Sequence, residues 1–215
     1  VEGTLRVSTT ESELVSLDVT RPALGPPVTI DLSGGMAALK PKQAVLKPGE
    51  TVPDFAMTTQ DGKPLHLSDL RGNVVVLTFI YTRCPLPDFC PLIDRKFKAL
   101  ADKLALVPAR AEHARLLSVS FDPEHDTPET LRKHARLKGA EPPLWSFAVA
   151  SHDELQKVAP SLGLSYLPGE NEIAHSLSTA IIDAEGKLVR LETGRSWDPT
   201  DFFKTIYPLL PVSRP

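Results

Sequence analysis

The stretch Val74–Tyr81 constrains the fold of this chain more than any other feature of its sequence. It reads VVVLTFIY, a run of β-branched and aromatic residues that only Thr78 interrupts. Such runs are typical of a strand that is buried on both faces in a parallel sheet. A parallel sheet needs helices packed against its faces, so we expect an α/β fold.

The segments after this strand alternate in the way that such a sheet requires. We expect strands at 115–121, 144–150, 178–183 and 188–193, and helices at 91–104, 128–138, 152–162 and 198–210. The turn residues Asp61 and Gly62 predict a β-hairpin over residues 55–67, ahead of the buried strand. The last two strands flank a short turn and should pair antiparallel. The pattern therefore predicts a mixed central sheet, with helices on both faces and an N-terminal β-hairpin.

The first fifty residues have a different pattern. Partial alternation at 4–8, 14–19 and 28–32 predicts short strands, and residues 40–50 look like a connector. We therefore expect a small β-rich extension with its connector at 1–50 and the α/β domain at 51–215. The chain begins at Val1 without a basic and apolar leader, so we expect a mature or trimmed form. The absence of a signal is then no argument for the cytoplasm.

The composition of the chain excludes several classes of protein. The chain has 24 basic and 27 acidic residues and a formal net charge of −3, which offers no electrostatic basis for binding nucleic acid. Its 2 cysteines are too few for a disulfide-stapled small protein. No apolar run reaches the roughly 18 residues that a membrane-spanning helix needs.

The two cysteines lie where an α/β sheet usually carries its chemistry. Cys84 follows the buried strand, and Cys90 lies in the first turn of the next helix, for which Asp88 is the expected N-cap. Ligands collect at the carboxyl edge of such sheets. Free backbone N–H groups and the helix dipole stabilise a thiolate at a helix N-terminus. We therefore expect Cys90 to have the lower thiol pKa of the two.

Three interpretations of this cysteine pair are open from the residues alone. The pair could form an inert disulfide that closes a loop. A zinc site would need four ligands, and the chain has no second cysteine pair. The third interpretation is a redox-active or copper-binding dithiol, because two thiolates with one imidazole suit copper.

Four separated motifs together resemble one family. They are VPDFAMTTQDGKPLHLSDLRG at 52–72, TFIYTRCP at 78–85, FDPEHDTPETL at 121–131 and NEIAHSLSTAIID at 171–183. The combination resembles the Sco/SenC family of thioredoxin-fold copper proteins, which help to assemble the copper site of respiratory oxidases. The resemblance implies a thioredoxin-like fold, the copper ligands Cys84, Cys90 and His175, and a supporting acidic residue, Asp122, outside the ligand set.

The chain departs from the family in one respect. The family's cysteines are usually spaced C-x3-C, whereas this chain has C-x5-C with Pro85 and Pro87 inside the loop. The longer loop leaves a purely thiol–disulfide role more open than in the family. The sequence argues against peroxidase chemistry, because neither cysteine follows the P-x-x-x-T-x-x-C motif of peroxiredoxins.

The other histidines have no predicted role in the site. We expect solvated surface positions for His66, His113, His134 and His152, and we do not count His125 as a ligand.

The resemblance implies a metallochaperone that binds Cu(I) or Cu(II) and delivers it to a cytochrome oxidase copper site. Its partner would be the oxidase subunit with that site, or another cuproprotein, and nucleic acid is not expected. The alternative is a thiol–disulfide reductase that uses Cys84 and Cys90 without metal to keep the oxidase cysteines reduced. A third possibility is a binding module whose cysteines only close a loop. We expect a monomer in the periplasm or another extracytoplasmic space, associated with a membrane through an anchor ahead of Val1.

Overall fold

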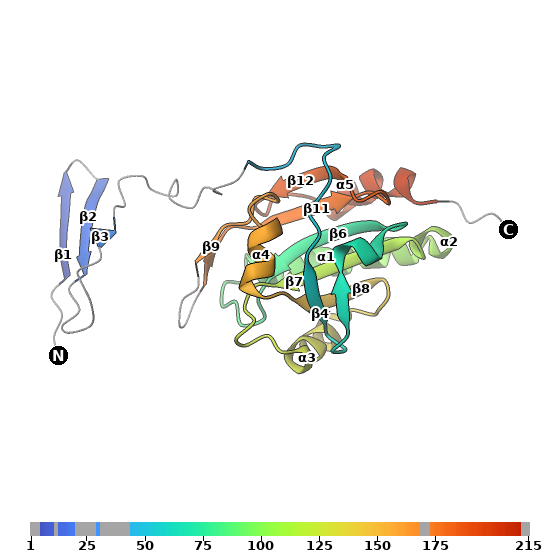
Figure 1. Ribbon diagram of the computed structural model, residues 1–215, viewed down its shortest axis with the longest axis horizontal. Helices are drawn as coiled ribbons and strands as arrows, with labels where there is room; N and C mark the ends of the chain where they lie inside the picture. Colours follow the sequence, from blue (N-terminus) through green and yellow to red (C-terminus); the bar gives the residue numbers. More distant parts are fainter. Residues whose placement is uncertain (1–4, 11–12, 20–28, 31–43, 168–172, 212–215) are drawn as a thin grey trace. The chain divides into compact units, whose positions relative to one another are not determined.

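The computed structural model describes residues 5–10, 13–19, 29–30, 44–167 and 173–211 (Figure 1). The chain divides into two compact units, Val1–Lys40 and Pro41–Pro215. The first contains an antiparallel sheet of three strands, β1 (Leu5–Thr10), β2 (Glu13–Val19) and β3 (Thr29–Ile30), at the positions where the sequence predicts strands.

The second unit is built on a mixed sheet of seven strands in the order β12-β11-β6-β7-β8-β4-β5. Their bounds are β4 (Ala56–Thr59), β5 (Pro64–His66), β6 (Val74–Ile80), β7 (Ala114–Ser120), β8 (Trp145–Val149), β11 (Ser178–Ile182) and β12 (Leu188–Thr193). Strands β6, β7 and β8 are parallel, and the remaining pairs are antiparallel. The predicted hairpin is β4–β5, and the predicted terminal pair is β11–β12.

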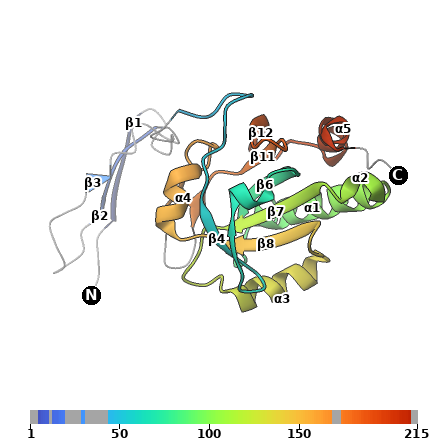
Figure 2. The same cartoon turned by 45° about the vertical axis from the view of Figure 1, so that its right-hand side comes forward.

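Helices cover both faces of this sheet (Figure 2). They are α1 (Cys90–Ala105), α2 (Pro108–Ala111), α3 (Pro128–Lys138), α4 (His152–Val158) and α5 (Pro199–Ile206). The crossovers β6-α1-β7 and β7-α3-β8 progress in one direction along the sheet, so their right-handed turns place α1 and α3 on the same face. Helix α5 packs beside α1, and α4 lies on the opposite face (Figure 2). The predicted mixed sheet with helices on both faces is confirmed.

The central strand determines where the candidate site lies. All seven residues of β6 are buried, as the apolar run predicts, and α1 packs Ile93, Phe97 and Leu100 into the same core. In the parallel pairing of β6 with β7, Ile80 lies opposite Ser120. The loops that follow these two strands therefore leave the sheet at the same edge, and Cys84 lies in the first of them.

Residues 44–50, which we assigned to the extension, belong to the larger unit. Leu46 N donates to Ser161 O at 2.8 Å, and Gly49 N donates to Leu188 O at 2.7 Å. The organisation into an extension and a thioredoxin-like domain stays a prediction, which limited proteolysis of the full chain would test. In the described part of the chain, no helix combines the length and apolar character needed to cross a membrane.

Candidate metal centre

Three side chains from different parts of the chain meet at the carboxyl edge of β6. Cys84, Cys90 and His175 each present one potential ligand atom, and these atoms lie within 4.8 Å of one another. Both cysteines are free thiols, and Cys90 Sγ lies 3.9 Å from His175 Nε2. The two extra residues of the C-x5-C loop therefore do not keep the sulfurs apart. The fold brings together the three side chains that the family resemblance singles out.

The imidazole of His175 is held in one orientation. Its Nδ1 lies 2.8 Å from the backbone oxygen of Ser176, which can only accept, so Nδ1 carries the proton. The neutral ring then has its lone pair on Nε2, which faces Cys90 and is free to bind a metal. The rings of Tyr81, Phe89 and Phe121 surround the imidazole at centroid distances of 5.5, 5.5 and 5.0 Å.

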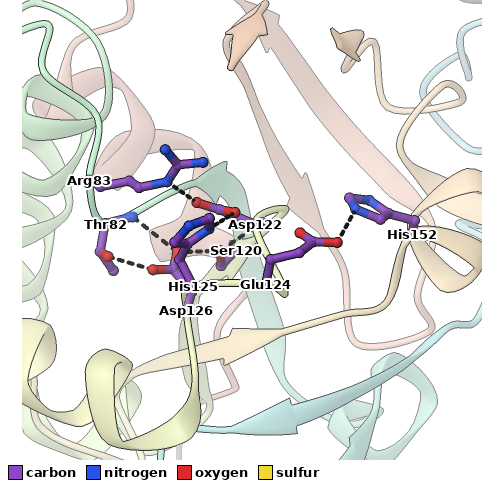
Figure 3. Close-up of polar contacts among 8 residues, drawn as sticks. All are labelled: Thr82, Arg83, Ser120, Asp122, Glu124, His125, Asp126 and His152. Carbon is purple, nitrogen blue, oxygen red and sulfur yellow. Dashed lines mark hydrogen bonds and ion pairs between the residues drawn. The ribbon is translucent and has the colours of Figure 1, made fainter. Parts of the chain in front are cut away.

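A small hairpin carries His175 to the cysteines. Its strands β9 (Tyr166–Leu167) and β10 (Ala174–His175) have no clear signal in the sequence, and residues 168–172 between them lie outside the described part. His175 lies opposite Tyr166 in this pairing. Tyr166 Oη lies 3.0 Å from His152 Nδ1, and His152 Nε2 lies 3.0 Å from Glu124 (Figure 3). These contacts connect the hairpin to α4 and to the loop after β7.

Two of the histidines that we expected on the surface are therefore not simply solvated. His152 is half-buried in the contacts just described, and His134 is half-buried with Nε2 at 2.9 Å from Asp94. Asp94 is itself buried, on α1. The sequence pattern missed these roles because each partner lies on a different element, 28 residues away for His152 and 40 for His134.

The two thiols have opposite pKa shifts. A hydrogen bond between the two thiols, with Cys90 as the donor, outweighs burial and lowers the pKa of Cys84 to about 3. The same hydrogen bond, together with burial, raises the pKa of Cys90 above its ordinary value. Cys84 is thus the thiolate of the pair, and Cys90 keeps its proton.

This order contradicts the prediction that Cys90 is the more acidic thiol. The prediction considered only the field of the helix, whereas Cys90 is the more deeply buried thiol and donates to its neighbour. The predicted N-cap was also wrong. Cys90 is the first residue of α1 and Phe89 is the N-cap, with no side-chain capping bond, so Asp88 lies outside the helix.

Asp122 lies beside the site but contacts the cysteine loop through Arg83. It is 2% exposed, Arg83 Nε donates to it at 2.6 Å, and His125 Nδ1 lies 2.9 Å from its other oxygen (Figure 3). Burial by itself would raise the pKa of Asp122, but the hydrogen bonds from Arg83 and His125 outweigh burial and lower it. The carboxylate therefore holds the residue that precedes Cys84.

A second buried carboxylate, Asp126, fixes the start of the same loop. It accepts hydrogen bonds from Thr82 N at 3.0 Å and from the hydroxyls of Thr82 and Ser120 (Figure 3). Asp126 belongs to the FDPEHDTPETL motif, but the sequence pattern did not predict this role. One feature of the sequence could have indicated this role. Asp126 is an acidic residue directly before Thr127, the N-cap of α3, and it lies at the same sheet edge as Cys84.

Comparison with known proteins identifies the family of this chain. A sequence model described as SCO1/SenC matches residues 43–209, most of the chain. The chain belongs to the Sco/SenC family. A relative named SCO1 protein homolog, from Bacillus subtilis, is 30% identical over 156 residues, which cover 70% of this chain and 77% of the relative.

Solved structures agree on the fold. The crystal structure of Arabidopsis thaliana ScoI with copper bound matches with a TM-score of 0.62 and 24% identity, over 74% of this chain and 99% of that one. BsSco, titled a member of the Sco family of cytochrome c oxidase assembly proteins with a disulfide switch, matches with a TM-score of 0.61 and 24% identity, over 77% and 96%. The thioredoxin domain of a Bacteroides vulgatus thiol-disulfide oxidoreductase matches with a TM-score of 0.54 and 17% identity, over 77% and 99%. The fold is therefore thioredoxin-like, as predicted.

Proposed function

We propose that this Sco/SenC protein binds copper through Cys84, Cys90 and His175 and delivers it to the copper site of a respiratory cytochrome oxidase. One observation carries the proposal: two sulfur atoms and one imidazole nitrogen lie within 4.8 Å of one another. Thiolates select Cu(I), and an imidazole helps to accommodate Cu(II). A closed zinc site usually has four protein ligands, which this set does not supply.

Each residue has a distinct part in holding the cargo. Cys84 offers a ready thiolate, and Cys90 completes the sulfur pair when its proton leaves, because metals bind the thiolate form. His175 adds a nitrogen whose direction the Ser176 carbonyl sets. Arg83 and Asp122 steady the loop from which Cys84 projects.

Two relatives support the choice of cargo and client. The Arabidopsis thaliana ScoI structure has copper bound, and BsSco is titled a member of a family of cytochrome c oxidase assembly proteins. The client is then the oxidase subunit that contains the copper site, or another cuproprotein. We also propose an extracytoplasmic, membrane-associated location and a monomeric state, which cell fractionation and analytical ultracentrifugation would test.

The asymmetry of the two thiols favours thiol–disulfide exchange as a second candidate function. The Cys84 thiolate would attack a disulfide of the client, and one client sulfur would leave as a thiolate. Cys90, after losing its proton, would attack Cys84 in the mixed disulfide and release the second client sulfur. The client gains two electrons, and Cys84 and Cys90 become a disulfide.

Copper titration of the reduced protein against a competing Cu(I) chelator separates these functions. We expect a 1:1 complex in the unchanged protein and loss of tight binding in Cys84→Ser and Cys90→Ser. His113→Ala is the matched control, because this histidine lies in the loop before β7, where its backbone oxygen accepts from Val74 N at the opposite end of β6 from the cysteines, and its Nε2 lies 3.4 Å from Glu112. Absence of binding in the unchanged protein, together with reduction of a disulfide substrate, would instead support the reductase.

A further inference from the structure

Glu124, His152 and Tyr166 form a chain of hydrogen bonds for which the sequence pattern predicts no role. His152 Nε2 lies 3.0 Å from a carboxylate oxygen of Glu124 (Figure 3), and His152 Nδ1 lies 3.0 Å from Tyr166 Oη. An ionised carboxylate can only accept, so the neutral imidazole donates from Nε2 and accepts from the Tyr166 hydroxyl at Nδ1. Both ring nitrogens are then paired, and the chain runs in one direction, from Tyr166 to Glu124.

The tyrosine at the end of this chain lies beside the histidine of the metal centre. Tyr166 and His175 are directly opposite each other in the antiparallel pairing of β9 with β10, so their side chains lie on the same face of the hairpin. Both rings pack against Phe121, at centroid distances of 5.3 Å for Tyr166 and 5.0 Å for His175. Phe121 is fully buried. The two rings therefore share one support, and a shift of the Tyr166 ring changes the packing of the imidazole.

The hairpin needs an anchor because its own pairing is small. Strands β9 and β10 have 2 residues each, and their other cross-strand pair, Leu167 with Ala174, is exposed. A two-stranded hairpin is at best marginally stable by itself. Contacts with the rest of the domain must therefore fix its place, and the bond from the Tyr166 hydroxyl to His152, the first residue of α4, is such a contact.

The chain ends on the loop that also holds the cysteines. Asp122 and Asp126, both in the loop after β7, accept hydrogen bonds from the loop that contains Cys84. Glu124 lies between these two aspartates in the chain and extends away from them, toward His152 (Figure 3). One short loop is therefore bonded to the cysteine loop directly and to the β9–β10 hairpin through the chain.

We propose that Glu124, His152 and Tyr166 position the His175 imidazole beside the cysteine sulfurs and thereby favour the binding of Cu(II). They are positioning residues, because none of the three supplies a ligand atom to the cluster. The effect on copper rests on the proposed function, whereas the ordering of the imidazole does not. Changes in the residues that hold a ligating histidine weaken metal binding about 10–100-fold. The contact with His175 is indirect here, so we expect about tenfold.

The variant Tyr166→Phe removes the hydroxyl and keeps the ring. In competition titrations of the reduced protein, we expect the Cu(II) affinity to fall about tenfold and the Cu(I) affinity to change less than about twofold, because two thiolates hold Cu(I) without the imidazole. Glu124→Ala should act in the same way, and Glu124→Gln, which keeps an oxygen that can accept from His152, should recover most of the affinity. Adding Tyr166→Phe to His175→Ala should cause no further loss, because the hydroxyl acts through that imidazole.

A measurement on the metal-free, reduced protein tests the ordering by itself. The NMR order parameter of the His175 imidazole Cε1–H bond should fall in Tyr166→Phe and in Glu124→Ala. Tyr207→Phe is the matched control and should leave the order parameter and both copper affinities unchanged. It removes a phenol hydroxyl from the segment after α5, where the guanidinium of Arg110 lies 4.4 Å from the centre of the ring.

Each result has a defined consequence. An unchanged order parameter in either Tyr166→Phe or Glu124→Ala overturns the positioning role, whether or not the protein binds copper. A lowered order parameter in a protein that binds no copper supports the positioning role and counts against the proposed function alone. Equal losses of Cu(I) and Cu(II) affinity, or an equal loss in Tyr207→Phe, overturn the proposal, because general loosening would explain them. If Tyr166→Phe does not fold, Glu124→Ala decides, because the Glu124 side chain is 59% exposed and its removal leaves the core intact.

Discussion

Replacing Asp122 with Asn should destabilise the protein in a pH-dependent way. Asp122 is 2% exposed, and the change leaves the Arg83 guanidinium without the carboxylate that it contacts at 2.6 Å. Removing one partner of a buried ion pair costs about 3–5 kcal/mol. The Arg83 side chain is 26% exposed and can gain some water contacts, so we expect a loss of about 2–3 kcal/mol at neutral pH.

The sign of the pH dependence follows from the lowered pKa of Asp122. A carboxyl group with a depressed pKa in the folded state stabilises the protein above its unfolded pKa of about 3.9. That contribution is lost as the pH falls through the lower, folded pKa. The stability difference between the unchanged protein and Asp122→Asn should therefore be constant above about pH 5 and shrink in stronger acid.

Urea unfolding at a series of pH values measures this difference. Glu129→Gln serves as a control because it removes a carboxylate from an exposed ion pair, 2.9 Å from Lys133, and should leave the free energy of unfolding nearly unchanged. A loss below about 1 kcal/mol in Asp122→Asn, or a loss that does not decline in acid, would refute the assigned role of the Arg83 contact.

Three further changes test other parts of the structure. His175→Ala should weaken Cu(II) binding more than Cu(I) binding, because two thiolates can still hold Cu(I); competition titrations that show equal losses would contradict this. Asp126→Asn should lower the free energy of unfolding by about 2–4 kcal/mol, since three donors lose a buried carboxylate; a change below about 1 kcal/mol in urea unfolding would argue against it. Thr127→Ala should lower the free energy of unfolding by about 1 kcal/mol, because the N-cap hydrogen bond to Thr130 N is lost. Thr200→Ala on α5 is the comparison, because it keeps the capping residue of that helix, Asp198.

The cysteine pair shows which properties of the site could be predicted from residues adjacent in the chain and which could not. That Cys84 follows a buried strand and Cys90 opens a helix could be predicted, because both depend on residues adjacent in the chain. The relative acidity of the thiols could not be predicted, because it depends on their mutual hydrogen bond and on the depth at which each is buried.

The sequence by itself determined the order of strands and helices, since hydrophobic periodicity is a property of neighbouring residues. It also determined the family, through motifs that include Cys84, Cys90 and His175. Only the tertiary structure brought His175 to Cys90, across 85 residues of chain, through the β9–β10 hairpin that has no clear signal of its own. The physical reason is that contacts between distant segments depend on how the sheet and its loops pack, and the spacing of residues along the chain does not record that packing.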